Sequence, residues 1–233
     1  MVWLILINGY LYMTNVTITK IQETLRSWVG LSGRSPNLQN RELHAKTILP
    51  NDTTSFALSY FYGGKRPNGT MMIPSTCALV TQAYLREVWG LHTSDLDTGY
   101  QYQIGQAFSD VAVIAKKYNA WVTDKNELSE IPGIGDCLQI GDNGSGGAYH
   151  FLNVVDYDAA TGAIISVDGG QVDGSWITER NRLLVTPEVK FYQNSAWLVD
   201  PDKPYKTDGS PNGRVITGKV SAKKLAETLG LTL

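Results

Sequence analysis

The first half of the chain carries hydrophobic residues at helical spacing, and the same spacing returns near its end. Apolar positions three or four apart predict amphipathic helices. The predicted helices span 17–31, 75–90, 101–118 and 221–229. After residue 120 the pattern changes to short apolar runs separated by glycine, proline and asparagine, which predict strands and hairpin turns. The predicted strands span 121–122, 137–140, 151–157, 163–167, 177–185 and 196–199, with a turn at 158–162. Helices followed by antiparallel strands indicate an α+β fold.

This layout divides the chain into three segments. Residues 1–57 form an N-terminal extension with one amphipathic helix, 58–200 form the main domain, and 201–233 form a linker and a short helix. The apolar run at 1–12 is too short to span a bilayer and lacks the basic start of a secretory signal, so we interpret it as an upstream extension or strand-like tail. We therefore expect no stable membrane insertion, and a cytoplasmic location until the protein is released or injected.

Composition narrows the possible partners. The net charge of −2 over 233 residues gives no electrostatic reason to expect a nucleic-acid partner. Two cysteines and three histidines, without a CxxC or Cys/His spacing, do not predict a metal site. We expect no cofactor.

Cys77 stands out because it falls in the first turn of the helix predicted at 75–90, with Ser75 or Thr76 as the N-cap. Backbone N–H groups point outward there and the helix dipole is positive, and both favour a thiolate. A thiolate is the reactive form of cysteine, so this placement suits a nucleophile. The alternative is a small buried hydrophobic residue, which is what most free cysteines are.

A cysteine nucleophile needs a base, and the base needs an orienting group. His150 begins a predicted strand and Asp168 ends the next one, so a hairpin through 158–162 brings both to the same end of the sheet. Alternation places His150 on one face with Leu152, and Phe151 on the other. Gln171 is the reserve candidate for the orienting role. The alternatives are a packing role for the histidine and a turn role for the aspartate, which precedes two glycines.

Several segments resemble a known family. Tyr-Phe-Tyr-Gly-Gly at 60–64, Pro-Asn-Gly at 67–69 and Cys-Ala-Leu-Val at 77–80 resemble the signature of the NlpC/P60 cysteine peptidases. Residues 131–138 resemble the family's Pro-Gly-Asp-Leu strand start, and residues 150–155 resemble its histidine strand. The related CHAP amidases carry a similar order of glycine-aspartate, histidine and acidic residue, and Ile165-Ser166-Val167-Asp168 resembles the strand that holds their third residue. The chain departs from the family at Thr76, where an aspartate is usual, and in the longer approach from the 67–69 turn to the cysteine.

The resemblance implies a papain-like α+β fold, with N-terminal helices packed on an antiparallel sheet, for a catalytic domain at 58–200. It also implies hydrolysis of peptide or amide bonds in bacterial peptidoglycan by an endopeptidase or amidase. Cys77 would attack the carbonyl, His150 would transfer the proton and Asp168 would orient His150. The backbone N–H of Cys77 would help to hold the oxyanion. Tyr60 would be a second donor or would pack beside Tyr62, and Gln171 would contact the substrate.

Two other functions stay open at this point. One is a papain-like acyltransferase or amidase that acts on a substrate outside the wall, since the same residues can pass an acyl group to an amine. The other is a catalytically inactive domain that serves as a binding module. A phage lysin, an injected effector and a recycling enzyme all fit the sequence, which identifies neither an immunity partner nor a delivery partner.

Overall fold

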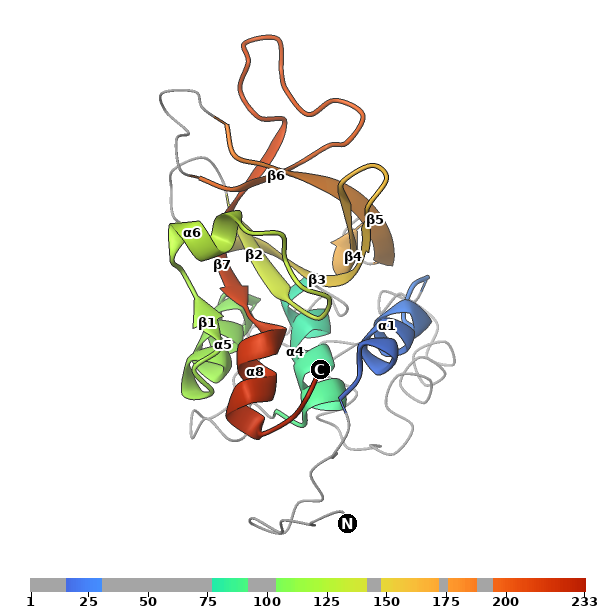
Figure 1. Ribbon diagram of the computed structural model, residues 1–233, viewed down its shortest axis with the longest axis vertical. Coiled ribbons are helices and arrows are strands. Elements are labelled where there is room, and N and C mark those ends of the chain that lie inside the picture. Colours follow the sequence, from blue (N-terminus) through green and yellow to red (C-terminus); the bar gives the residue numbers. More distant parts are fainter. Residues whose placement is uncertain (1–15, 31–76, 92–103, 142–147, 172–175, 188–194) are drawn as a thin grey trace, which may run out of the picture.

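The computed structural model describes residues 16–30, 77–91, 104–141, 148–171, 176–187 and 195–233, which are coloured in Figure 1. Its helices are α1 (Ile18–Ser27), α4 (Cys77–Trp89), α5 (Ile104–Lys117), α6 (Lys125–Ser129) and α8 (Ala222–Leu229). Its strands are β1 (Trp121–Val122), β2 (Cys137–Gly141), β3 (Ala148–Asp158), β4 (Ala163–Gln171), β5 (Trp176–Val185), β6 (Trp197–Val199) and β7 (Gly213–Val220). None of the described helices has the length and apolar character needed to cross a membrane.

Hydroxyl side chains begin two of the helices. The Thr17 hydroxyl accepts a hydrogen bond from the Lys20 N–H at the start of α1, at 3.1 Å. The Ser221 hydroxyl does the same for the Lys224 N–H at the start of α8, at 3.3 Å. Such caps satisfy N–H groups that have no acceptor within the helix. Helix α8 ends at Gly230, whose φ of 67° is a left-handed conformation that glycine adopts without strain.

The strands form a closed barrel. Antiparallel pairing runs in the order β7-β2-β3-β4-β5-β6, and β6 pairs back onto β7, while β1 adds to the other part of β7. Strand β7 therefore completes the barrel between β2 and β6. The close approach of β6 and β7 requires Gly213, because a Cβ at this position would lie 1.9 Å from the Leu198 carbonyl oxygen.

The predicted α+β, papain-like NlpC/P60 fold with N-terminal helices on an antiparallel sheet is wrong. The described residues are mostly β, with a closed six-stranded antiparallel barrel, one added strand and few helices. The difference depends on β7, which lies within the segment that the sequence predicted as a linker and a short helix. Thr217, Gly218 and Lys219 interrupt the apolar pattern of this strand, so its periodicity does not reveal it.

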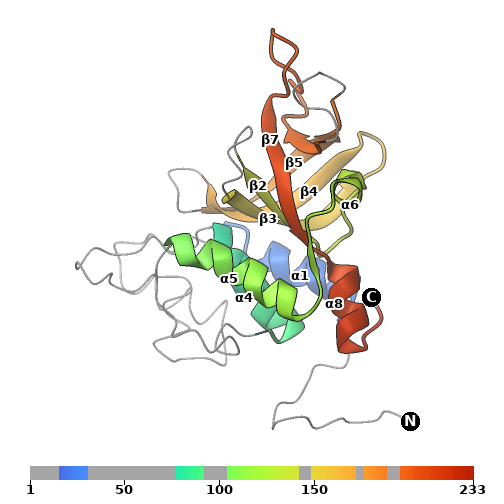
Figure 2. The same ribbon diagram turned by 90° about the vertical axis from the view of Figure 1, so that its left-hand side faces the viewer.

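Two hydrophobic clusters lie on the two faces of the barrel wall. The inner cluster includes Leu138, Leu152, Val154, Ile164, Leu198 and Ile216. The outer cluster joins Phe151, Val155 and Val167 to the helices α1, α4, α5 and α8. These helices gather on one side of the barrel in both views (Figures 1 and 2). The predicted alternation of β3 is confirmed, because Leu152 belongs to the inner cluster and Phe151 to the outer one.

The two ends of the barrel differ in what covers them. Helix α6 precedes β2, and its Leu128 joins the inner cluster at the end where β2 begins. His150 pairs with Ile140 near the other end of β2. The interior is therefore apolar beneath α6, and His150 lies toward the opposite end.

Candidate active site

Cys77 is the first residue of α4, as the helix is described, and helix α4 packs against β3 and β4. The N–H groups in the first turn of a helix have no acceptor within the helix. The residue is 7% exposed and contributes to the outer hydrophobic cluster. The second cysteine, Cys137, is completely buried in the same cluster, and both thiols are free. Burial raises the pKa of the Cys137 thiol well above its usual value, and the nearby Asp136 carboxylate adds to this effect.

His150 connects Cys77 to Asp168. Its Nε2 atom lies 2.6 Å from Oδ2 of Asp168, and its ring also forms a side-chain hydrogen bond with Cys77. The histidine is 9% exposed and Asp168 is completely buried. A cysteine, a histidine and a carboxylate in this order are the groups that a nucleophile, its base and an orienting residue require.

Strand register explains why His150 and Asp168 meet. Ser166 pairs with Val154 of the inner cluster, so Ser166 faces the interior of the barrel. Asp168 is two residues further along β4 and faces the same way. His150 lies on the inner face of β3 together with Leu152. Both functional side chains therefore point to the inner side of the barrel wall, at the end where β3 begins.

Arg182 is a functional candidate that the sequence did not identify. It lies on β5 opposite Ile164, which places it on the inner face. Its Nη2 donates to Oδ2 of Asp168 at 3.0 Å and its Nη1 lies 3.4 Å from Oδ1. Nη1 also donates to the Ser166 hydroxyl, which in turn donates to Oδ1 of Asp168 at 3.3 Å. The carboxylate is thus held on both oxygens.

These contacts set the charges of the buried pair. Burial opposes ionisation of Asp168, but the hydrogen bond from His150 and the charge of Arg182 outweigh it and lower the pKa of this carboxyl group. Burial likewise opposes the charged form of His150, but the hydrogen bonds with Asp168 and Cys77 raise its pKa to about 9. His150 is therefore an imidazolium at neutral pH.

His150 and Arg182 both contact the buried Asp168 carboxylate. Arg182 and protonated His150 carry two positive charges, and Asp168 carries one negative charge. An uncompensated charge in a buried site is costly. A neighbouring imidazolium is one of the environments in which cysteines act as nucleophiles.

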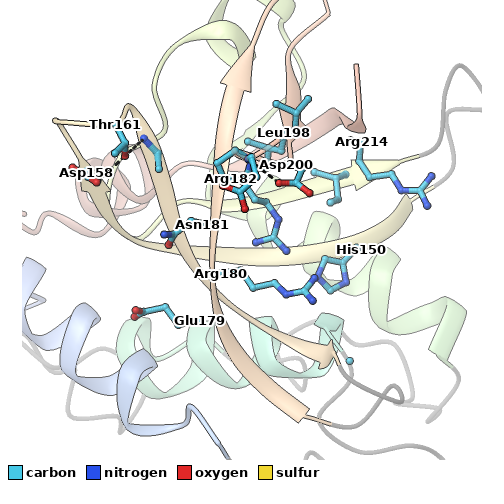
Figure 3. A pocket seen from close by; sticks show the side chains of 17 residues that line it. His150, Asp158, Thr161, Glu179, Arg180, Asn181, Arg182, Leu198, Asp200 and Arg214 are labelled. Atoms are coloured by element: carbon cyan, nitrogen blue, oxygen red, sulfur yellow. Dashed lines mark hydrogen bonds between the residues drawn. The ribbon is translucent and has the colours of Figure 1, made fainter. Parts of the chain in front are cut away.

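A cavity of about 950 Å³ opens beside His150 and Arg182 (Figure 3). His150, Arg180, Arg182 and Arg214 line it together with carboxylates and apolar side chains. Figure 3 shows the Arg180 side chain close to His150, with Asp158 and Glu179 farther from the histidine. The cavity gives a substrate access to the histidine.

The structure brings together three of the five residues that the sequence predicted for the site, namely Cys77, His150 and Asp168. Tyr60 lies outside the described residues. The backbone of Gln171 pairs with Trp176 at the end of β4, and its side chain lies outside the described part. In the described part of the chain, no group of three or more histidine, cysteine, aspartate or glutamate residues is arranged to hold a metal ion.

Comparison of the chain with protein-family models, with curated proteins and with solved structures found no match. The chemistry of the site is therefore argued from its own geometry.

Proposed function

We propose that the protein is a cysteine hydrolase that cleaves peptide or amide bonds. Cys77 is the nucleophile, His150 transfers the proton and Asp168 orients His150. One observation carries this proposal: the His150 ring contacts both the buried Asp168 carboxylate, at 2.6 Å, and the Cys77 side chain. A histidine that only packs in a core does not need both an anionic partner and a cysteine beside it.

The reaction proceeds in two steps. The Cys77 thiolate attacks the carbonyl carbon, and the backbone N–H of Cys77 donates a hydrogen bond to the oxyanion that forms. His150 gives its proton to the leaving amine, so the C–N bond breaks and a thioester remains on the sulfur. Neutral His150 then takes a proton from water, which attacks the thioester and releases the carboxylic acid. The thiolate and the imidazolium are restored, and the net change is the addition of one water to the amide.

The proposed substrate is a peptide of bacterial peptidoglycan, cleaved by an endopeptidase or amidase activity. Support comes from the resemblance of residues 60–69, 77–80 and 131–138 to the NlpC/P60 signature. The fold that this resemblance implied is not the fold of the described residues, so the substrate rests on the motifs alone. The protein would reach the wall by release or injection from the cytoplasm.

Alkylation tests the nucleophile directly. The native protein is treated with iodoacetamide, and labelling of the two cysteines is followed by peptide mass spectrometry. We expect fast labelling at Cys77 and slow labelling at Cys137, which is buried and has a raised pKa. The Cys137→Ala variant is the matched control and should retain the fast phase. Equal labelling of both cysteines would contradict the proposal.

Digestion of purified peptidoglycan tests the reaction. Mass spectrometry of the muropeptides should show products that have gained water, and the Cys77→Ala variant should release none. Products in which an added amine replaces the leaving amine would indicate acyl transfer instead. An unchanged muropeptide profile, together with hydrolysis of other peptides that Cys77→Ala abolishes, would retain the hydrolase and reject the wall substrate.

A further inference from the structure

Arg180 lies on the inner face of the barrel, two residues before the arginine that holds Asp168. It pairs with Ser166, which faces the interior, so the two side chains share that face. Arg180 is exposed and lines the same cavity as His150. Figure 3 shows its side chain extended toward the His150 ring.

Nothing among the described residues neutralises Arg180. Arg182, by contrast, is engaged with Asp168 and Ser166. Of the carboxylates that also line the cavity, three have other partners, and the fourth, Asp202, lies beyond the end of β6. Asp158 accepts hydrogen bonds from Thr161 and Ala160 at the β3–β4 turn.

Glu179 is the neighbour of Arg180 on β5, but it faces the other side of the sheet. It pairs with Val167 of the outer cluster and forms an ion pair with Arg26 of α1 at 2.9 Å. Asp200 follows β6 and accepts a hydrogen bond from the Asp202 N–H. The part of the cavity that Arg180 and His150 line therefore has a positive charge available to a ligand.

We propose that Arg180 forms a carboxylate-binding subsite, and that the protein prefers acyl donors that carry a free carboxylate close to the scissile bond. A guanidinium binds a carboxylate through two parallel N–H donors, so it fixes orientation as well as charge. The subsite would place the carbonyl of such a donor at Cys77. This inference rests on the proposed function for the identity of the nucleophile, and it adds the chemical class of the substrate.

The test compares two alkylating reagents that differ in charge. Iodoacetate carries a carboxylate and iodoacetamide is its neutral analogue, and both form the same bond to the sulfur of Cys77. We expect Arg180→Gln to slow iodoacetate about fivefold, as for an ion pair at an exposed arginine, and to leave the iodoacetamide rate unchanged. Arg180→Lys should keep most of the preference, since it keeps the charge.

Lys206→Gln is the matched control, because it removes one positive charge from an exposed position that does not line the cavity. It should leave the ratio of the two rates unchanged. An unchanged ratio in Arg180→Gln, or an equal loss with both reagents, would overturn the inference. So would an equal change of the ratio in Lys206→Gln, because only net charge would then matter.

A substrate pair completes the experiment. Peptides with a free carboxylate next to the scissile bond should be hydrolysed faster than their amidated forms, and Arg180→Gln should remove most of the difference. If the wild type hydrolyses neither peptide but the reagent ratio still depends on Arg180, the anion subsite stands and the hydrolase proposal fails. If the wild type hydrolyses both equally, the substrate preference fails and the hydrolase proposal stands.

Discussion

Replacing His150 with glutamine tests whether the buried imidazole is charged in the folded protein. The pKa of His150 rises from 6.5 to about 9 on folding, because its hydrogen bonds with Asp168 and Cys77 outweigh the effect of burial. A folded pKa above the unfolded value means that the protonated group stabilises the fold. This contribution is fully present below about pH 6.5 and is lost as the pH rises through about 9.

The size of the effect follows from the same two values. A rise from 6.5 to about 9 corresponds to about 3 kcal/mol of unfolding free energy. The attraction between His150 and Asp168 also lowers the pKa of the carboxyl group, so it is counted only once. Among the described residues, the charged and titratable groups around His150 include Cys77 from α4, Asp168 from β4, Arg180 and Arg182 from β5, and Arg214 from β7.

Urea unfolding between about pH 6 and about pH 10, under reducing conditions, gives the free energy of unfolding at each pH. The wild type should lose about 3 kcal/mol relative to His150→Gln across this range. Repeating the comparison in a Cys77→Ser background should give a smaller loss, because the contribution of Cys77 to the raised pKa of His150 is gone. A difference between wild type and His150→Gln that stays constant with pH would refute a charged imidazole.

Three further substitutions test the contacts around the site and in the barrel. Arg182→Gln should lower the free energy of unfolding by about 3–5 kcal/mol, because Asp168 is completely buried and loses a partner. Urea unfolding measures this loss. A stability equal to that of the wild type would mean that the ion pair contributes nothing. Gly213→Ala should lower the free energy of unfolding by more than about 2 kcal/mol, because the added Cβ would lie 1.9 Å from a β6 carbonyl oxygen. Thermal denaturation should show a clearly lower midpoint temperature. An unchanged midpoint would show that β6 and β7 do not meet as described. Tyr84→Phe removes a 2.9 Å hydrogen bond from the tyrosine hydroxyl to the Gly135 carbonyl and should lower the free energy of unfolding by about 1 kcal/mol. Calorimetry can measure this loss, and an unchanged stability would contradict the contribution of this hydrogen bond.

The local pattern of apolar residues was sufficient to predict most elements of the described chain. The predicted helix at 17–31 corresponds to α1, and the turn at 158–162 joins β3 to β4. That turn also places His150 and Asp168 at one end of the sheet, because the pairing of a hairpin follows from its turn. The proximity of these two residues was therefore predictable without any knowledge of the barrel.

The closure of the barrel and the role of Arg182 could not be predicted in this way. Closure depends on pairing between β7 and strands far away in the sequence, which local periodicity does not report. Arg182 occurs in a strand rich in polar residues and has the appearance of a surface residue in the sequence. Its partner Asp168 becomes evident only when the inner faces of β4 and β5 are known.

The closing strand also constrains when the protein can fold during synthesis. Strand β7 pairs with β1, β2 and β6, so these three strands depend on a partner that leaves the ribosome after them. Until then, β2 and β6 each have an unpaired edge, and such edges template pairing with other chains. Pairings between strands that are distant in sequence also form slowly. The nascent chain therefore has two unpaired strand edges late in translation, and the completion of β7 removes both.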